Sequence, residues 1–179
     1  MLKCHMDQKG FSLIELIMVI FIMGVASTIV AVQYSDSRNS KALYLGSKQI
    51  ANDIRMTQNY TFSSLEDGGA NPSGGYGIRF SENSNSYLIF ADEDSDRARN
   101  ADNSEDFQTI NLPDGVKVIS LEIDTVGADP VDVVFTSPYG EVYINGNNKN
   151  AGSFINLEIE IGNSSGTRVI KISTSRKIN

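Results

Sequence analysis

The sequence predicts an α+β protein in which one long N-terminal helix packs on an antiparallel β-sheet domain. Residues 11–32 are almost wholly apolar, and residues 33–65 continue with apolar positions at three- and four-residue steps, which is the period of a helix. Residues 66–179 instead contain short runs of alternating apolar and polar residues, separated by turns rich in Gly, Asn and Asp. A single helix followed by many antiparallel strands is typical of the α+β class.

Residues 11–32 have the length and composition of a membrane-spanning helix. Their 22 residues contain one charged side chain, Glu15. A helix of that length extends about 33 Å, close to the thickness of the hydrocarbon core of a bilayer. Lys3 and Lys9 precede the run. Basic residues at this position favour a cytoplasmic N-terminus, so the rest of the chain is expected on the other side of the membrane.

Two simpler interpretations of this start remain open. A secretory signal peptide would end at a site of small residues, and residues 26–28 (Ala-Ser-Thr) offer a weak one. However, the apolar run is longer than a usual signal core, and the helical pattern continues beyond it. A plain membrane anchor leaves Glu15 unexplained, because a carboxylate costs on the order of 2.5–3.5 kcal/mol at mid-membrane and somewhat less near the end of the span.

Residues 9–16 (KGFSLIEL) closely resemble the class III signal of type IV prepilins and type II secretion pseudopilins. The resemblance implies a pilin-like fold and a leader, residues 1–10, that an inner-membrane prepilin peptidase removes by cleaving between Gly10 and Phe11. It also implies N-methylation of the new Phe11 amine by the same peptidase/methyltransferase. In the family, Glu15 is thought to pair with the Phe11 amine of a neighbouring subunit during filament assembly.

The chemistry of these residues suits that role. Gly10 has no side chain, so a protease can approach the backbone closely. An unpaired buried carboxylate is costly and a paired one is tolerable, so Glu15 is expected to set the register between subunits. The chain would then be a single-pass protein of the inner (cytoplasmic) membrane, with its C-terminal domain periplasmic or extracellular, before it enters a pilus or pseudopilus.

Residues 33–65 are predicted to form an amphipathic helix that packs on the domain. The buried stripe is expected to comprise Leu43, Gly46, Ile50, Ile54, Thr57, Thr61 and Leu65. The opposite face carries Lys41, Lys48, Asn52, Arg55 and Asn59. Residues 66–69 (Glu-Asp-Gly-Gly) and Pro72 should end the helix and begin a loop.

The β-rich domain, residues 66–179, is expected to contain eight strands. Their predicted ranges are 76–80, 86–91, 107–112, 116–123, 131–136, 141–144, 154–161 and 167–173. In residues 154–161, four aliphatic side chains alternate with polar ones, and residues 162–166 (GNSSG) should connect this strand to the last one as a hairpin. Within 116–123 the apolar phase shifts between Val118 and Ile119, which predicts a β-bulge.

The order of these segments resembles the minor pseudopilin H / fimbrial protein T family. The matching segments are 76–80 (YGIRF), 87–92, the hairpin from Phe135 to Glu141, and the closing hairpin that ends at residues 175–178 (SRKI). That family commonly has Gly-Arg where this chain has Ser-Arg at 175–176.

The composition excludes several kinds of active site. The only cysteine, Cys4, and the only histidine, His5, lie in the predicted leader, so the mature chain would have no thiol, disulfide or imidazole chemistry. The net charge of −7 argues against general nucleic-acid binding. Removal of the leader leaves 13 of 15 basic and 21 of 22 acidic side chains. We therefore expect a structural protein and not an enzyme.

One acidic segment has the alternating carboxylates with which a calcium loop begins: Asp92, Asp94 and Asp96. An EF-hand would have Gly at its sixth position and Glu at its twelfth, where this chain has Arg97 and Asn103. The two interpretations are a solvated acidic loop and a weak extracellular Ca²⁺ site. No other cofactor is expected.

Four basic residues lie in the last twelve: Arg168, Lys171, Arg176 and Lys177. They could contact DNA phosphates, and some fimbrial T proteins act in DNA uptake. The simpler interpretation is a solvated strand face, because no aromatic residue accompanies these charges in the sequence.

Two functions follow from the sequence. The first is a minor pilin or pseudopilin subunit whose partners are the peptidase, other pilin or pseudopilin subunits and an inner-membrane assembly platform. The alternative is a DNA- or substrate-binding module at a pilus tip. Major pilins often carry a disulfide, for which the mature chain has no cysteine. The sequence leaves open whether the machine is a type II secretion system, a type IV pilus or a competence pilus.

Overall fold

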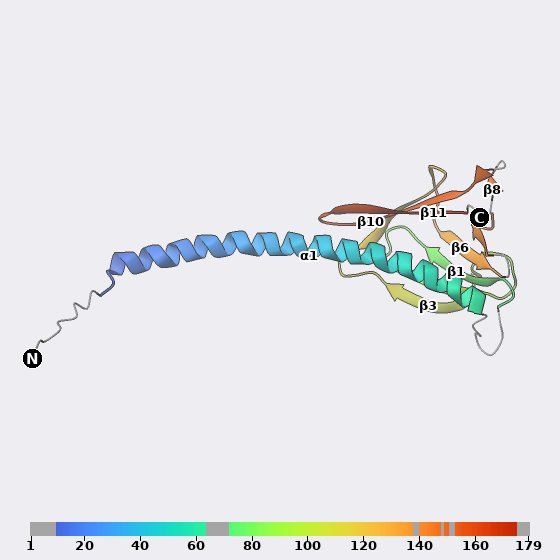
Figure 1. The fold of residues 1–179 in the computed structure, drawn as a ribbon, viewed down its shortest axis with the longest axis horizontal. Helices are drawn as coiled ribbons and strands as arrows, with labels where there is room; N and C mark the ends of the chain where they lie inside the picture. Colours follow the sequence, from blue (N-terminus) through green and yellow to red (C-terminus); the bar gives the residue numbers. More distant parts are fainter. Residues whose placement is uncertain (1–9, 64–71, 138–139, 148, 151–152, 175–179) are drawn as a thin grey trace, which may run out of the picture. The chain divides into compact units, whose positions relative to one another are not determined.

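The computed structural model describes residues 10–63, 72–137, 140–147, 149–150 and 153–174, with the side chains of 29–33, 35, 149–150 and 153 excepted. The chain divides into two compact units, residues 1–38 and 39–179. A helix, α1 (Leu13–Ser63), contributes to both, as the sequence predicts (Figure 1). Leu65 of the predicted stripe and most of the predicted leader lie outside the described residues.

The described strands form three antiparallel sheets. The five-stranded sheet has the order β3 (Asp106–Asn111), β2 (Ser86–Asp92), β1 (Gly75–Phe80), β6 (Val131–Thr136) and β7 (Glu141–Ile144). The four-stranded sheet has the order β11 (Gly166–Ser173), β10 (Asn156–Asn163), β4 (Lys117–Ile123) and β5 (Val126–Gly127). The short pair is β8 (Lys149–Asn150) and β9 (Ser153–Phe154).

All eight predicted strands are present within a few residues of their expected ends, and the sequence missed three two-residue strands. β5, β8 and β9 are too short to show an alternation of apolar and polar residues. The predicted bulge is confirmed. Val118 pairs with Ile161 and Ser120 pairs with Glu160, so Ile119 is the extra residue of β4.

The second half of α1 packs on the sheets through the predicted stripe. Leu43, Gly46, Ile50, Thr57 and Thr61 are buried, whereas the residues of the predicted polar face are exposed. At Gly46 an added Cβ would lie 3.3 Å from the Val116 side chain, so the glycine lets the helix pack closely against Val116.

One hydrophobic core joins this helix to both large sheets. Its members include Ile50 from the helix, Ile78 and Val133 from the five-stranded sheet, and Leu121 and Ile159 from the four-stranded sheet, all fully buried. Removal of these side chains from water provides the main driving force for packing the helix against the sheets.

The five-stranded sheet also has a covered outer face. Phe90, Val134 and Tyr143 form a second buried cluster there, because successive residues of a strand point to opposite faces. Gly77 lies beneath the Phe90 ring, where an added Cβ would be 2.4 Å from the ring. The connection between β2 and β3, residues 93–105, folds over this face and positions the acidic residues described below.

Candidate functional site

The first turn of α1 carries the single carboxylate of the apolar segment. The carbonyl oxygen of Ser12 accepts hydrogen bonds from the N–H groups of Glu15 (3.0 Å) and Leu16 (3.2 Å), so Ser12 occupies the N-cap position of the helix. Glu15 is the third helical residue and lies at the positive end of the helix dipole, which favours a carboxylate. Ser12 and Glu15 also have the spacing of a capping box, which is visible in the sequence.

The peptide bond between Gly10 and Phe11 precedes the helix and is open to solvent. Gly10 and Phe11 have no regular secondary structure, and the Phe11 side chain is 84% exposed. No atom outside its immediate neighbours would lie within 4 Å of a Cβ at Gly10. A peptidase requires an accessible, non-helical backbone at the bond it cleaves, and this bond meets that requirement.

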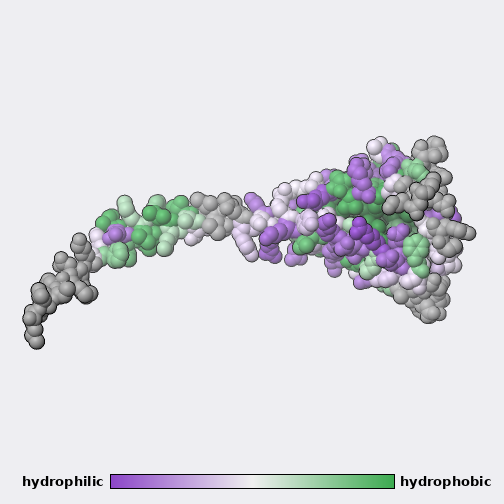
Figure 2. All heavy atoms as spheres, in the orientation of Figure 1, coloured by the Kyte–Doolittle hydropathy of each residue, from purple (hydrophilic) through white to green (hydrophobic). Residues whose placement is uncertain are grey.

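The beginning of α1 exposes apolar side chains on all sides. Eleven large ones are between 45% and 76% exposed: Leu13, Ile14, Leu16, Ile17, Met18, Val19, Ile20, Phe21, Ile22, Met23 and Val25. On the face drawn in Figure 2, apolar residues likewise predominate in this part of the helix. A helix that is apolar all round is normally buried in protein or in lipid.

The polar side chains at the end of this segment are satisfied within the helix. The Ser27 hydroxyl donates to the carbonyl of Met23 (2.7 Å), and the Thr28 hydroxyl donates to that of Val25 (2.8 Å). Such bonds remove the cost of placing hydroxyl groups in an apolar environment. Across the described residues, no helical stretch meets the combined length and hydropathy that a membrane span requires.

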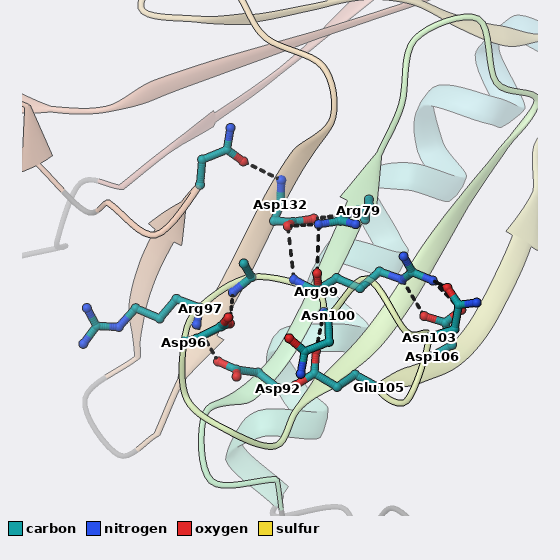
Figure 3. Close-up of polar contacts among 12 residues, drawn as sticks. Arg79, Asp92, Asp96, Arg97, Arg99, Asn100, Asn103, Glu105, Asp106 and Asp132 are labelled. Carbon is teal, nitrogen blue, oxygen red and sulfur yellow. Dashed lines mark hydrogen bonds and ion pairs between the residues drawn. The ribbon is translucent and has the colours of Figure 1, made fainter.

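The predicted calcium residues are brought together at the start of the β2–β3 connection. Asp92 is fully buried at the end of β2, while Asp94 and Asp96 are exposed. One carboxylate oxygen from each lies within 4.8 Å of the others. Oδ2 of Asp92 accepts a hydrogen bond from the backbone N–H of Arg97 at 3.1 Å (Figure 3). Oδ1 of Asp92 has no hydrogen-bond partner among the described residues.

Burial raises the pKa of Asp92 from 3.8 to about 6. The Arg97 N–H opposes this shift, and the negative charges of Glu105 and Asp96 add to it. An ionised Asp92 is therefore costly without a positive partner.

No role was expected for Glu105, which stabilises the shape of this loop. It is 1% exposed, and its two carboxylate oxygens accept the N–H groups of Glu93 (3.0 Å) and Asn100 (2.8 Å). The two bonds join the first residue of the connection to its middle. Its position in the sequence, among several solvated acidic residues, gives no signal of burial.

Of the four predicted basic contacts, Arg168 and Lys171 are described and lie on β11. Lys171 forms an ion pair with Glu158 (2.5 Å). The guanidinium carbon of Arg168 lies 5.4 Å from the centre of the Tyr44 ring, and Lys48 Nζ lies 5.7 Å from it. No aromatic residue accompanies these charges in the sequence, but the fold brings Tyr44 of the helix close to Arg168. Arg176 and Lys177 lie outside the described residues.

Comparison with known proteins gives one match. Residues 5–31 match the model of the prokaryotic N-terminal methylation motif, which supports a type IV pilin-like protein. No curated protein and no solved structure matches the chain. The match covers the predicted cleavage site, Glu15 and most of the apolar run.

Proposed function

We propose that this chain is a type IV pilin-like subunit that is cleaved after Gly10, N-methylated at Phe11 and assembled into a filament through the N-terminal part of α1. The observation that carries the proposal is the place of the methylation motif. It covers a helix start that is apolar on all sides and holds one carboxylate in its first turn. A structural role of this kind needs no catalytic residues.

The assembly step follows from the chemistry of Glu15 and Phe11. Cleavage creates a positively charged amine at Phe11, at the end of the chain next to the helix. When the apolar helices of two subunits pack together, an unpaired Glu15 would be costly, whereas pairing with the neighbour's amine offsets that cost. The pair would select one axial register among the many that apolar surfaces alone would allow.

The finer assignment is a minor pilin or pseudopilin. Before assembly, residues 11–32 would span the inner membrane, with the C-terminal unit on the periplasmic or extracellular side. The partners would be the prepilin peptidase/methyltransferase, other pilin or pseudopilin subunits and the inner-membrane assembly platform. Support comes from the apolar run, the preceding lysines and the resemblance to the pseudopilin H / fimbrial T family.

Mass spectrometry of the mature N-terminus tests the processing step. The chain is produced together with a prepilin peptidase, and the expected product begins at N-methylated Phe11. Gly10→Val places a branched side chain at the cleaved bond and should leave the leader attached. Gly127→Val is the control, because Gly127 also has open space around it but lies far along the chain. A wild-type product that begins at Met1 or after Ala26 would overturn the proposal.

Filament fractionation tests the role of Glu15. Glu15→Val and Glu15→Gln should be cleaved and retained in the membrane, yet be depleted from filaments at least tenfold relative to wild type, the change that ~1.4 kcal/mol produces. Glu122→Gln removes an exposed carboxylate from β4 and should enter filaments normally. Normal incorporation of both Glu15 variants would contradict the pairing.

A second candidate function is DNA binding at a filament tip, favoured by the approach of Lys48 and Arg168 to the exposed Tyr44 ring. Cations beside an aromatic face can engage phosphates and stack bases. Fluorescence anisotropy with a short duplex should then show binding that weakens with salt, and Lys48→Gln or Arg168→Gln should each reduce the salt slope by about 1. Arg55→Gln is the control, and binding insensitive to these variants would eliminate this candidate.

A further inference from the structure

The β2–β3 connection concentrates negative charge that its own basic residues do not neutralise. Between residues 92 and 106 the sequence has seven acidic and two basic side chains. Arg99 pairs with Asp106 through Nε and Oδ1 (2.5 Å). The Arg97 guanidinium lies 4.0 Å from the centre of the Tyr143 ring, on the outer face of the sheet. No described basic side chain forms an ion pair with Asp92, Asp94 or Asp96.

The spacing of the three aspartates suits one ion. Calcium binds oxygen ligands at about 2.3–2.6 Å, so two ligands of the same ion are at most about 5 Å apart. The three carboxylates each offer an oxygen within 4.8 Å of the other two. The cluster therefore has the dimensions of a shared coordination sphere before any ion enters.

The buried oxygen of Asp92 is the independent sign of a ligand. Asp92 is fully buried, and its Oδ1 has no partner among the described residues, although a buried carboxylate oxygen is normally hydrogen-bonded or coordinated. Figure 3 shows the Asp92 carboxylate directed toward the turn that carries Asp96 and Arg97. Gly74 makes this position available, because a Cβ at Gly74 would lie 2.1 Å from Oδ2 of Asp92.

Backbone bonds hold the other two carboxylates in place. Oδ1 of Asp94 accepts the N–H of Asp96 (3.1 Å), and Oδ1 of Asp96 accepts the N–H of Ala98 (2.8 Å). The remaining oxygen of Asp94 accepts a weak bond from the Asn100 amide (3.2 Å). Each carboxylate thus retains capacity for a cation, since every oxygen has two lone pairs.

We propose that Asp92, Asp94 and Asp96 form a calcium-binding site at the end of β2. The ion neutralises three clustered carboxylates and supplies the missing partner of the buried Asp92 oxygen. Backbone carbonyls and water complete its coordination. The irregular loop suits the flexible geometry of Ca²⁺, whereas Mg²⁺ requires a near-octahedral set of ligands at shorter distances. The affinity expected of such an extracellular module corresponds to a dissociation constant of about 10⁻⁴–10⁻³ M. This site does not depend on the proposed role of Glu15.

Calorimetry and thermal unfolding of the full-length chain in detergent test the site. Protein stripped with EDTA is titrated with CaCl₂ and, separately, with MgCl₂. At a Ca²⁺ concentration about five times the dissociation constant, the melting temperature of the β-rich unit should rise by roughly 2–4 °C. The same concentration of Mg²⁺ should produce a clearly smaller rise.

Matched variants distinguish coordination from general screening of charge. Asp94→Asn and Asp96→Asn retain a side-chain oxygen that can accept the turn hydrogen bond, so they should fold and lose most of the Ca²⁺ response. Asp102→Asn removes an exposed charge elsewhere in the connection and should retain the full response. The proposal is overturned if wild type does not respond to Ca²⁺, if Mg²⁺ acts equally, or if all three variants respond like wild type.

Discussion

Arg79 and Asp132 face each other across β1 and β6 and form a two-bonded ion pair on the outer face of the five-stranded sheet. Arg79 Nε lies 2.6 Å from Oδ1 of Asp132, and Nη2 lies 2.5 Å from Oδ2. The same two side chains also bind the backbone of Arg99 (Figure 3). Arg79 Nη2 donates a hydrogen bond to the Arg99 carbonyl oxygen, and Asp132 Oδ2 accepts one from the Arg99 N–H, both at 3.2 Å. The pair thereby fastens the β2–β3 connection to the sheet.

Loss of Asp132 should destabilise the β-rich unit strongly. The Asp132 side chain is 6% exposed, so Asp132→Ala leaves the Arg79 charge without its partner and should lower the free energy of unfolding by about 3 kcal/mol. Lys171→Ala removes an exposed ion pair and should lower the free energy of unfolding by less than about 1 kcal/mol. Urea unfolding followed by near-ultraviolet circular dichroism compares the two. Equal effects would contradict the importance of the Arg79 pair.

A methyl group at Gly77 should disturb the packing beneath Phe90. The added Cβ of Gly77→Ala would lie 2.4 Å from the end of the Phe90 ring, so the ring must move. Overpacking of this kind should cost about 1–3 kcal/mol in the free energy of unfolding. Gly127→Ala, whose Cβ meets no atom within 4 Å, should have little effect. Recovery of stability in Gly77→Ala with Phe90→Leu would assign the loss to this contact.

The hydroxyl of Tyr87 should contribute to the attachment of α1 to the five-stranded sheet. It donates a short hydrogen bond to Oδ2 of Asp53 and accepts one from the Gln49 amide (3.3 Å). Tyr87→Phe should therefore lower the melting temperature, with a loss of about 1–2 kcal/mol in the free energy of unfolding. Tyr44→Phe, at an exposed ring, provides the control. A Tyr87→Phe protein as stable as wild type would refute this attachment.

The stability of the calcium-free chain should fall as pH rises between about 4 and 6. Burial raises the pKa of Asp92 to about 6, so the folded state binds more protons than the unfolded state in this range. The contribution of Asp92 protonation to the free energy of unfolding is fully present below pH 4 and is lost as pH rises through 6. It amounts to at most about 3 kcal/mol. Besides burial, the groups that act on this carboxyl are the backbone N–H groups of Arg97 and Ser95 and the negative charges of Glu105 and Asp96.

The difference between wild type and Asp92→Asn isolates this titration. Unfolding free energies are measured in EDTA at pH 4, 5, 6 and 7, and the variant should lack the decline attributable to Asp92. Asp102→Asn should keep the wild-type profile in that range. If wild type and Asp92→Asn change in parallel, the Asp92 carboxyl does not control the pH dependence.

The helix and most of the strands could be predicted from the sequence, because periodic patterns of apolar residues are local. The stripe from Leu43 to Thr61 and the alternation from Ile155 to Ile161 identified the buried faces of α1 and β10. The phase shift at Ile119 located the bulge for the same reason. The helix start was readable as well, since its motif lies within a few consecutive residues.

The contacts between side chains that are distant in the sequence became visible only in the folded chain. The pairing of β1 with β6 places Arg79 opposite Asp132, and packing of the helix beside β11 brings Tyr44 to Arg168. Burial of Asp92 likewise depends on a loop that folds back over the sheet. Such contacts are set by strand order and by long-range packing, which no local pattern of residues specifies.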